Sequence, residues 1–251
     1  MKLAVLGSGS PISNAERATT GYLAESASGK IIFDLGFGCF KNLQKVANPL
    51  EISAICISHF SHPDHVADLI AFLFHRKVSV LKKIAVANQL NLFGPAGFGA
   101  FFESLTKAFP SFSNLPFPIK VTEVGYDKLN IFNFIVRTKP VKHSGDSAIA
   151  FRIEADGKAI MYSGDSEYCD ALVELAKDAD LAILECSTTI NKTDGHLSHE
   201  ECAQIAKQAD AKALMLSHLY PDTENLDFKA LLAEKFSGKI IKANDLLKVE
   251  V

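Results

Sequence analysis

Residues 59–65 read HFSHPDH, so three histidines and one aspartate fall within seven positions. They follow the apolar run AICIS at 54–58, which predicts a short buried strand that delivers a loop. Imidazole and carboxylate groups are typical ligands of zinc, manganese and iron. The segment therefore predicts a metal-binding loop, and we expect its remaining ligands where other buried strands end.

Composition indicates a packed globular protein. The 251 residues are 48% hydrophobic and 22% charged, which does not fit a disordered chain. The net charge of −3 argues against a large nucleic-acid footprint. No signal peptide or membrane span is expected, and five scattered cysteines without a C-x-x-C pair favour reduced thiols in a cytoplasmic protein.

Hydrophobic patterning predicts strands and helices in both halves of the chain. GYLAES and KIIFDL are expected to form a hairpin, KIAVA at 83–87 a strand, and the residues after His65 an amphipathic helix. Further helices are predicted near 98–108, 167–177, 199–209 and 226–236. Strand clusters with inserted helices suggest packed sheets covered by helices, and we interpret residues 1–251 as one domain.

Polar side chains follow three more predicted strands. His143 lies in PVKHSGD, Asp165 in IMYSGDSE and His218 in LMLSH. A buried strand that ends in such a side chain needs a partner for it, so the strand ends are expected to converge. Together with HFSHPDH they give seven candidate ligands: His59, His62, Asp64, His65, His143, Asp165 and His218.

Seven ligands are too many for one tetrahedral ion and suit two divalent ions with a bridging carboxylate. Zinc is the simplest choice, with manganese or iron as alternatives. Two ions ~3.5–4 Å apart can activate hydroxide and stabilise the entering and leaving oxygens in hydrolysis of a phosphodiester or ester. Each residue alone has a plainer interpretation: a strand-end histidine is often structural, and Asp165 could cap a helix. Cys186 in LECS is best explained as a buried thiol.

The motifs resemble those of a known family. SHFSHPDHVADL is similar to the H-x-H-x-D-H signature of the metallo-β-lactamase superfamily, and VKHS, SGDS and SHLYP match its later ligand motifs. LGSGSP, ERATTGYL, GPAG and DGHLS resemble the ribonuclease Z and arylsulfatase-type branch. The resemblance implies an α/β (α+β) fold, a four-layer αββα sandwich, with two metals at one edge.

The resemblance also implies a role for each residue. The first ion would take His59, His62 and His143, the second Asp64, His65 and His218, and Asp165 would bridge them. His196 in GHLS matches a histidine that acts as general acid or holds the scissile phosphate. The predicted catalytic residues are His196 and, from the second metal site, Asp64. The alternative for His196 is a solvated position before a helix capped by Ser198 and Glu201. Asp34 in FDLG would support the histidine loop.

One spacing departs from the family pattern, because two residues rather than one separate His59 from His62. Side chains three apart in an extended chain point to opposite sides, so both can share an ion only if the backbone bends near Phe60 and Ser61. Serine tolerates such turns well. The alternative is a weakened or empty first site.

A second departure concerns length. Residues 97–120 offer a short helix and PSFSNLPFP where ribonuclease Z proper carries a long tRNA-gripping arm. With the acidic net charge, this favours a small phosphodiester or ester over long nucleic acid. The predicted function is a metal-dependent hydrolase, most simply a phosphodiesterase. A carbonyl-ester, lactone or thioester hydrolase and a degenerate metal-binding protein are the alternatives. A homodimer is suggested only by its frequency in this branch.

Overall fold

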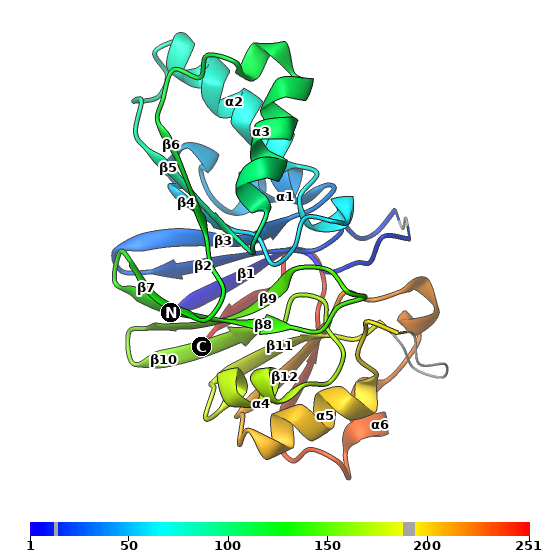
Figure 1. The fold of residues 1–251 in the computed structure, drawn as a ribbon. Coiled ribbons are helices and arrows are strands. Elements are labelled where there is room, and N and C mark those ends of the chain that lie inside the picture. The colour runs from blue at the N-terminus through cyan, green and yellow to red at the C-terminus, as the bar shows by residue number, and fades with distance from the viewer. Residues whose placement is uncertain (13–14, 188–193) are drawn as a thin grey trace.

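The computed structural model describes residues 1–12, 15–187 and 194–251 and contains two seven-stranded sheets that face each other. Helices cover the outer surface of each sheet, which gives the order helix, sheet, sheet, helix from top to bottom of Figure 1. The predicted αββα sandwich is confirmed.

The first sheet has the strand order β14-β1-β2-β3-β4-β5-β6. Its strands are β1 (Lys2–Gly7), β2 (Gly21–Ser26), β3 (Gly29–Leu35), β4 (Ala54–Cys56), β5 (Leu90–Gly94), β6 (Ile119–Glu123) and β14 (Lys248–Glu250). Pairing is antiparallel from β14 to β3 and parallel from β3 to β6. The predicted hairpin is confirmed as β2 and β3.

The second sheet has the order β13-β12-β11-β10-β9-β8-β7. Its strands are β7 (Asp127–Ile131), β8 (Phe134–Val141), β9 (Ala148–Ala155), β10 (Lys158–Tyr162), β11 (Leu181–Glu185), β12 (Ala213–Ser217) and β13 (Lys239–Lys242). Pairing is antiparallel from β7 to β10 and parallel from β10 to β13. Because parallel strands end at the same edge of a sheet, the loops after them gather there.

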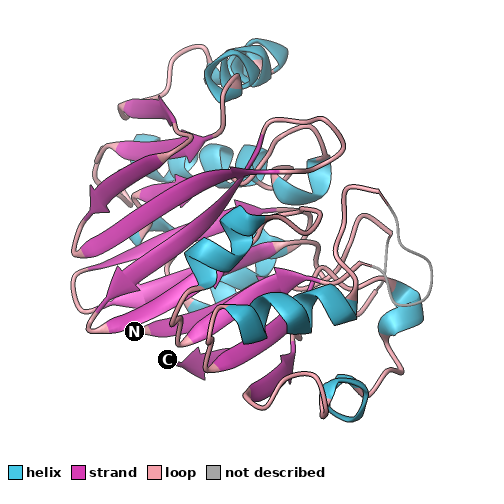
Figure 2. Cartoon of the chain, turned by 60° about the horizontal axis from the view of Figure 1, so that its bottom comes forward, coloured by secondary structure: helices cyan, strands magenta, loops and turns pink. Residues whose placement is uncertain are grey.

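Six α-helices lie in the described ranges, three on each outer face. The first sheet carries α1 (Cys39–Val46), α2 (Leu69–Leu81) and α3 (Phe98–Ala108), and the second carries α4 (Asp170–Ala176), α5 (His199–Gln208) and α6 (Phe228–Leu232). Figure 2 shows helices lying across the strands of the layer that faces the viewer. The helix at 98–108 has the predicted bounds, and α5 begins with the predicted capping box of Ser198 and Glu201.

Three buried apolar clusters join the four layers: one under α1–α3, one between the sheets and one under α4–α6. In the middle cluster, Phe33 of β3 meets Phe151 of β9 edge to face, with ring centroids 5.2 Å apart. Both rings are almost completely buried. Aromatic pairs of this geometry add to the stabilisation from burial, so this contact helps to hold the sheets together.

The predicted strand KIAVA is wrong. Residues 83–87 form no strand, and the side chains of Ile84 and Val86 are 70% and 74% exposed. Lys83 takes a left-handed backbone conformation (φ 58°) directly after α2, so the chain turns there and enters the sheet only at Leu90. The apolar residues of KIAVA thus lie exposed in the connection between α2 and β5 and not in the sheet.

Several element boundaries differ from the sequence prediction. The helix after His65 begins at Leu69, because residues Pro63–His65 form a separate 3₁₀ turn. The helices expected at 167–177 and 226–236 are shorter, α4 and α6, and β7 was not predicted. Residues 97–120 contain only α3, a 3₁₀ turn at Pro110–Phe112 and the start of β6, as expected for a short connection.

Among the described residues, no helix is long and apolar enough to cross a membrane. The cytoplasmic location and the single-domain organisation stay predictions.

Replacement of Phe151 by alanine tests the contact between the sheets. We expect the free energy of unfolding to fall by about 3–5 kcal/mol, the usual cost of removing a buried phenylalanine ring. The measurement is chemical denaturation of the metal-free protein. Phe74→Ala is the matched control, because that ring is 51% exposed and its loss should cost far less. Equal losses for both variants would contradict the proposed packing role.

Candidate metal centre

The predicted ligands converge at one edge of the two sheets. The histidine loop follows β4, His143 follows β8, Asp165 follows β10 and His218 follows β12. The side-chain nitrogen and oxygen atoms of these residues form overlapping groups in which every member lies within 4.8 Å of the others. All except His62 are buried. The structure therefore brings together all seven residues that the sequence picked out.

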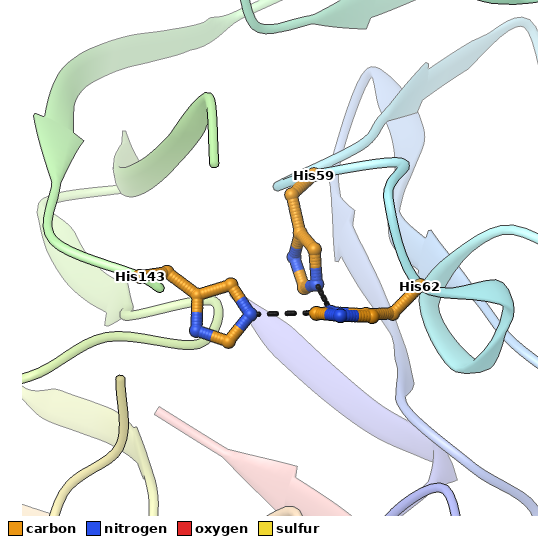
Figure 3. Close-up of side chains that lie close together, drawn as sticks. All are labelled: His59, His62 and His143. Atoms are coloured by element: carbon orange, nitrogen blue, oxygen red, sulfur yellow. Dashed lines mark hydrogen bonds between the residues drawn. The ribbon is translucent and has the colours of Figure 1, made fainter. Parts of the chain in front are cut away.

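One group consists of three imidazoles. His62 Nδ1 lies 3.3 Å from His59 Nε2 and 3.2 Å from His143 Nε2, and Figure 3 shows the three rings meeting at these nitrogens. The chain bends at residues 60–62 before the 3₁₀ turn begins at Pro63. This bend is the one that the three-residue spacing requires, so His59 and His62 face the same point.

A second group contains Asp64, His65 and His218. His218 Nε2 lies 3.2 Å from Asp64 Oδ2, and His65 Nε2 lies 3.6 Å from the same oxygen. Asp64 and His65 both belong to the 3₁₀ turn that follows His62, so one short loop contributes to both groups.

Asp165 lies between the two groups. Its Oδ1 is 3.2 Å from His65 Nε2, its Oδ2 is 3.3 Å from His218 Nε2, and His59 lies in the same close set. The alternative role of a helix cap is wrong, because α4 begins only at Asp170 with Cys169 before it. Asp165 is therefore free to interact with both groups.

The donor atoms fit divalent cations. Asp64 Oδ1, Asp165 Oδ1 and His65 Nε2 are buried and make no well-aligned hydrogen bond within the described ranges, which is costly without a further partner. Burial holds the pKa of His59 well below its usual value, and burial alone would raise the pKa of Asp165. The charges of His218 and His65 instead lower the pKa of Asp165 well below its usual value. A neutral imidazole and an ionised carboxylate are the forms that bind metals.

The pKa of His65 is set by two neighbouring carboxylates as well as by its burial. Its burial would lower the pKa, but the charges of Asp165 and Asp34 raise it well above the usual value. A cation among the same carboxylates satisfies them equally and leaves the imidazole free to ligate. The residues present therefore fit a divalent metal site.

Asp34 fixes the histidine loop from behind. Its carboxylate accepts hydrogen bonds of 2.6 Å from both the backbone N–H and the hydroxyl of Ser58, and it lies 2.7 Å from His65 Nδ1. Tyr162 donates its hydroxyl proton to the same carboxylate. The predicted supporting role of Asp34 agrees with these contacts, whereas Tyr162 was missed because it enters from the other sheet, 128 residues along the chain.

Two further imidazoles are oriented from behind in the same way. His143 Nδ1 lies 2.9 Å from the carbonyl oxygen of Gly195, and His218 Nδ1 lies 2.8 Å from the hydroxyl oxygen of Ser187. Such contacts fix which ring nitrogen is left for a metal and hold the ring plane. Sequence reasoning missed Ser187, since a lone serine after a strand carries no signal of its own.

His196 pairs with a glutamate that the sequence analysis overlooked. Its Nδ1 lies 2.9 Å from Glu185 Oε1, and its side chain is only 13% exposed, so the solvated-loop alternative does not hold. Burial would lower the pKa of His196, but the hydrogen bond and charge of Glu185 raise it to about 9. A signal for Glu185 was available: it is an acid at the end of the buried apolar strand LAILE, one residue before Cys186.

Comparison with known proteins identifies the class. A family model described as "Beta-lactamase superfamily domain" matches residues 30–219, and the chain belongs to this superfamily. Within it, the chain is similar to ribonuclease Z of Mycolicibacterium gilvum, at 30% identity over all of this chain and 96% of that protein. It is also similar to the probable metallo-hydrolase YhfI of Bacillus subtilis, at 29% identity over 87% of each chain. The chain is thus a ribonuclease Z-like member of the superfamily.

Solved structures support the same fold. The crystal structure of Bacillus subtilis YhfI, described as a metallo-β-lactamase fold protein, matches with a TM-score of 0.85 at 24% identity over 100% of this chain and 99% of that chain. The human tRNase Z short form matches with a TM-score of 0.81 at 21% identity and the same coverage. Family and ligand groups together support a metal-dependent hydrolase that binds divalent metal.

Replacement of Asp34 by asparagine tests the support of the histidine loop. We expect metal affinity to fall roughly 10–100-fold, the usual effect of losing a partner of a ligating histidine. The measurement is competition with a chromophoric chelator. Asp178→Asn is a matched control, because Asp178 is exposed and shares the left-handed backbone (φ 54°) of Asp34. An unchanged affinity in Asp34→Asn would contradict the role.

Proposed function

We propose that this protein is a dinuclear metal-dependent phosphodiesterase. The observation that carries the proposal is the pair of ligand groups that meet at Asp165, since each group offers three donors and Asp165 is within reach of both. In this proposal one ion binds His59, His62 and His143, and the other binds Asp64, His65 and His218. Zinc is the favoured metal, because imidazole and carboxylate donors suit it and no thiolate is involved.

Two divalent ions in this site would activate water for attack and neutralise charge on the oxygens of the reacting phosphorus. The chain's own residues supply the rest. Asp64 and Asp165 bring negative charge that holds the cations, and the hydrogen bond from His65 to Asp34 fixes that ring. His196 carries a proton at neutral pH because of Glu185, so it can donate that proton to a leaving oxygen.

The substrate is the open part of the proposal. The net charge of −3 and the short connection at 97–120 favoured a small phosphodiester. The names of the relatives, ribonuclease Z and tRNase Z, do not support that preference and speak for RNA as a substrate of those proteins. We therefore propose a phosphodiester bond as the target and leave the size of its substituents to experiment. A homodimer also stays a prediction.

Metal content and a substrate panel test the activity. We expect about two divalent ions per chain by elemental analysis, and cleavage of bis(p-nitrophenyl) phosphate that is lost with chelator and restored by zinc or manganese. A small cyclic phosphodiester, a tRNA with a 3′ extension, a lactone and a thioester complete the panel. Cleavage of the carbonyl esters alone would replace the phosphodiesterase by an esterase of the same fold. One ion or none without turnover would indicate a degenerate metal-binding protein.

The pH dependence of turnover tests the role of His196. A proton donor with a pKa of about 9 is active below that pH, so we expect the rate to fall as pH rises through about 9. Glu185→Gln removes the charge that raises this pKa, so the fall should begin at lower pH. His196→Ala should reduce turnover about 10²–10⁴-fold and abolish this limb of the profile. A phosphodiester with a good leaving group should be affected less, and an unshifted limb in Glu185→Gln would refute the assignment.

A further inference from the structure

The residue that disturbs the spacing of the histidine loop makes a specific contact. Ser61 donates its hydroxyl proton to Asp146 Oδ2 at 2.8 Å. Asp146 lies in the loop between β8 and β9, and its backbone N–H donates to the carbonyl oxygen of His143 at 2.7 Å. The extra residue of one loop is therefore tied to the turn that carries the third histidine of the other.

Phe60, the neighbour of Ser61, anchors the same bend from the opposite side. Its ring stacks on Phe101 with centroids 5.0 Å apart and lies 5.9 Å from Phe98, both on α3. The ring also packs against Gly97, where an added Cβ would lie 3.3 Å from Phe60 Cζ. With Phe60 turned into the apolar layer under α3, the hydroxyl of Ser61 is presented toward the His143 loop.

His62 needs such a support because its own side chain has little. It is exposed, and within the described ranges its Nδ1 has only His59 and His143 in hydrogen-bonding range. Both of these partners are themselves candidate ligands, so neither contact supports the ring of His62 from outside the three-histidine group. The position of His62 relative to His143 therefore depends on contacts between their loops. These include the side-chain hydrogen bond from Ser61 to Asp146 and the backbone hydrogen bond from Ile149 N–H to the carbonyl oxygen of Ser58 at 3.0 Å.

We propose that Ser61 and Asp146 are positioning residues of the three-histidine site: their hydrogen bond clamps the His59–His62 bend onto the His143 turn and so sets the affinity of that site for a divalent cation. The proposal rests on the proposed function, because it presupposes that the three histidines bind an ion. In this proposal the extra residue, Ser61, supports the three-histidine site and does not disrupt it.

The experiment measures zinc affinity of each site by chelator competition in Ser61→Ala, Asp146→Ala and the double variant. We expect each single variant to weaken the three-histidine site about tenfold, at the low end of the effect of a residue that supports a metal ligand. The double variant should lose no more than either single, because both remove the same contact. Ser61→Thr keeps the hydroxyl at an exposed position and should retain the wild-type affinity.

Two controls separate positioning from general damage. Ser147→Ala changes an exposed serine of the same loop whose hydroxyl makes no hydrogen bond within the described ranges, and should leave both affinities unchanged. In a His62→Ala background, which removes a ligand of the three-histidine site, Ser61→Ala should leave the affinity of the remaining ion unchanged. Thermal unfolding of the metal-free variants should match that of the wild type within a few degrees.

The outcomes are distinguishable. Wild-type protein that binds two ions, with both affinities retained in Ser61→Ala and Asp146→Ala, overturns the clamp and leaves the proposed function intact. Equal weakening of both sites also overturns it, since the contact would then act on the whole fold. Wild-type protein that binds one ion, with the same content in His62→Ala, overturns the dinuclear proposal and the clamp with it.

Discussion

Three carboxylates buried at one edge of the sandwich, Asp34, Asp64 and Asp165, impose the constraint on which the site depends. An ionised carboxylate removed from water is costly unless positive charge or hydrogen-bond donors compensate it. Asp34 has donors from Ser58 and Tyr162, whereas Asp64 and Asp165 keep one buried oxygen each without a hydrogen bond in the described ranges. The imidazoles around these two acids compensate them only in part, which fits the binding of divalent metal beside them.

The fold meets this constraint with backbone conformations that are unfavourable elsewhere. Asp34 and His218 both adopt left-handed conformations, with φ 54° at each. Asp34 is the next-to-last residue of β3, and His218 directly follows β12. Such a conformation costs about 1–2 kcal/mol for a residue with a Cβ, and it persists only where the surroundings enforce it. At Asp34 the enforcing contacts are those to Ser58 and His65, and at His218 the contact to Ser187. His218 thereby contributes to a ligand group, whereas Asp34 supports His65 from behind.

The layers and the convergence of the seven candidate ligands could be predicted from the sequence because both follow from local patterns. Apolar runs that end in histidine or aspartate mark the strand ends, and the helix at 98–108 and the capping box at Ser198 follow from short-range chemistry. Residues whose role depends on the packing of one sheet against the other could not be predicted. Tyr162 reaches Asp34 across 128 positions, and Ser187 acquires its role only when β12 brings His218 beside it. The strand prediction for KIAVA was wrong for a different reason. Its local pattern is apolar, but the strand that pairs with β4 is β5, which begins only at Leu90.

The histidine loop shows that two side chains can reach the same relative position with different spacings in the sequence. Two residues in place of one between His59 and His62 would separate their side chains in an extended chain. The bend at 60–62 removes the conflict, and it is held by a ring on one side, Phe60 against α3, and by a hydroxyl on the other, Ser61 against Asp146. With the extra residue, the geometry of the loop is no longer set by the loop alone. It also depends on contacts with α3 and with the loop between β8 and β9. The geometry of the three-histidine site therefore depends more strongly on the relative position of the two sheets than it would if the loop had the regular spacing.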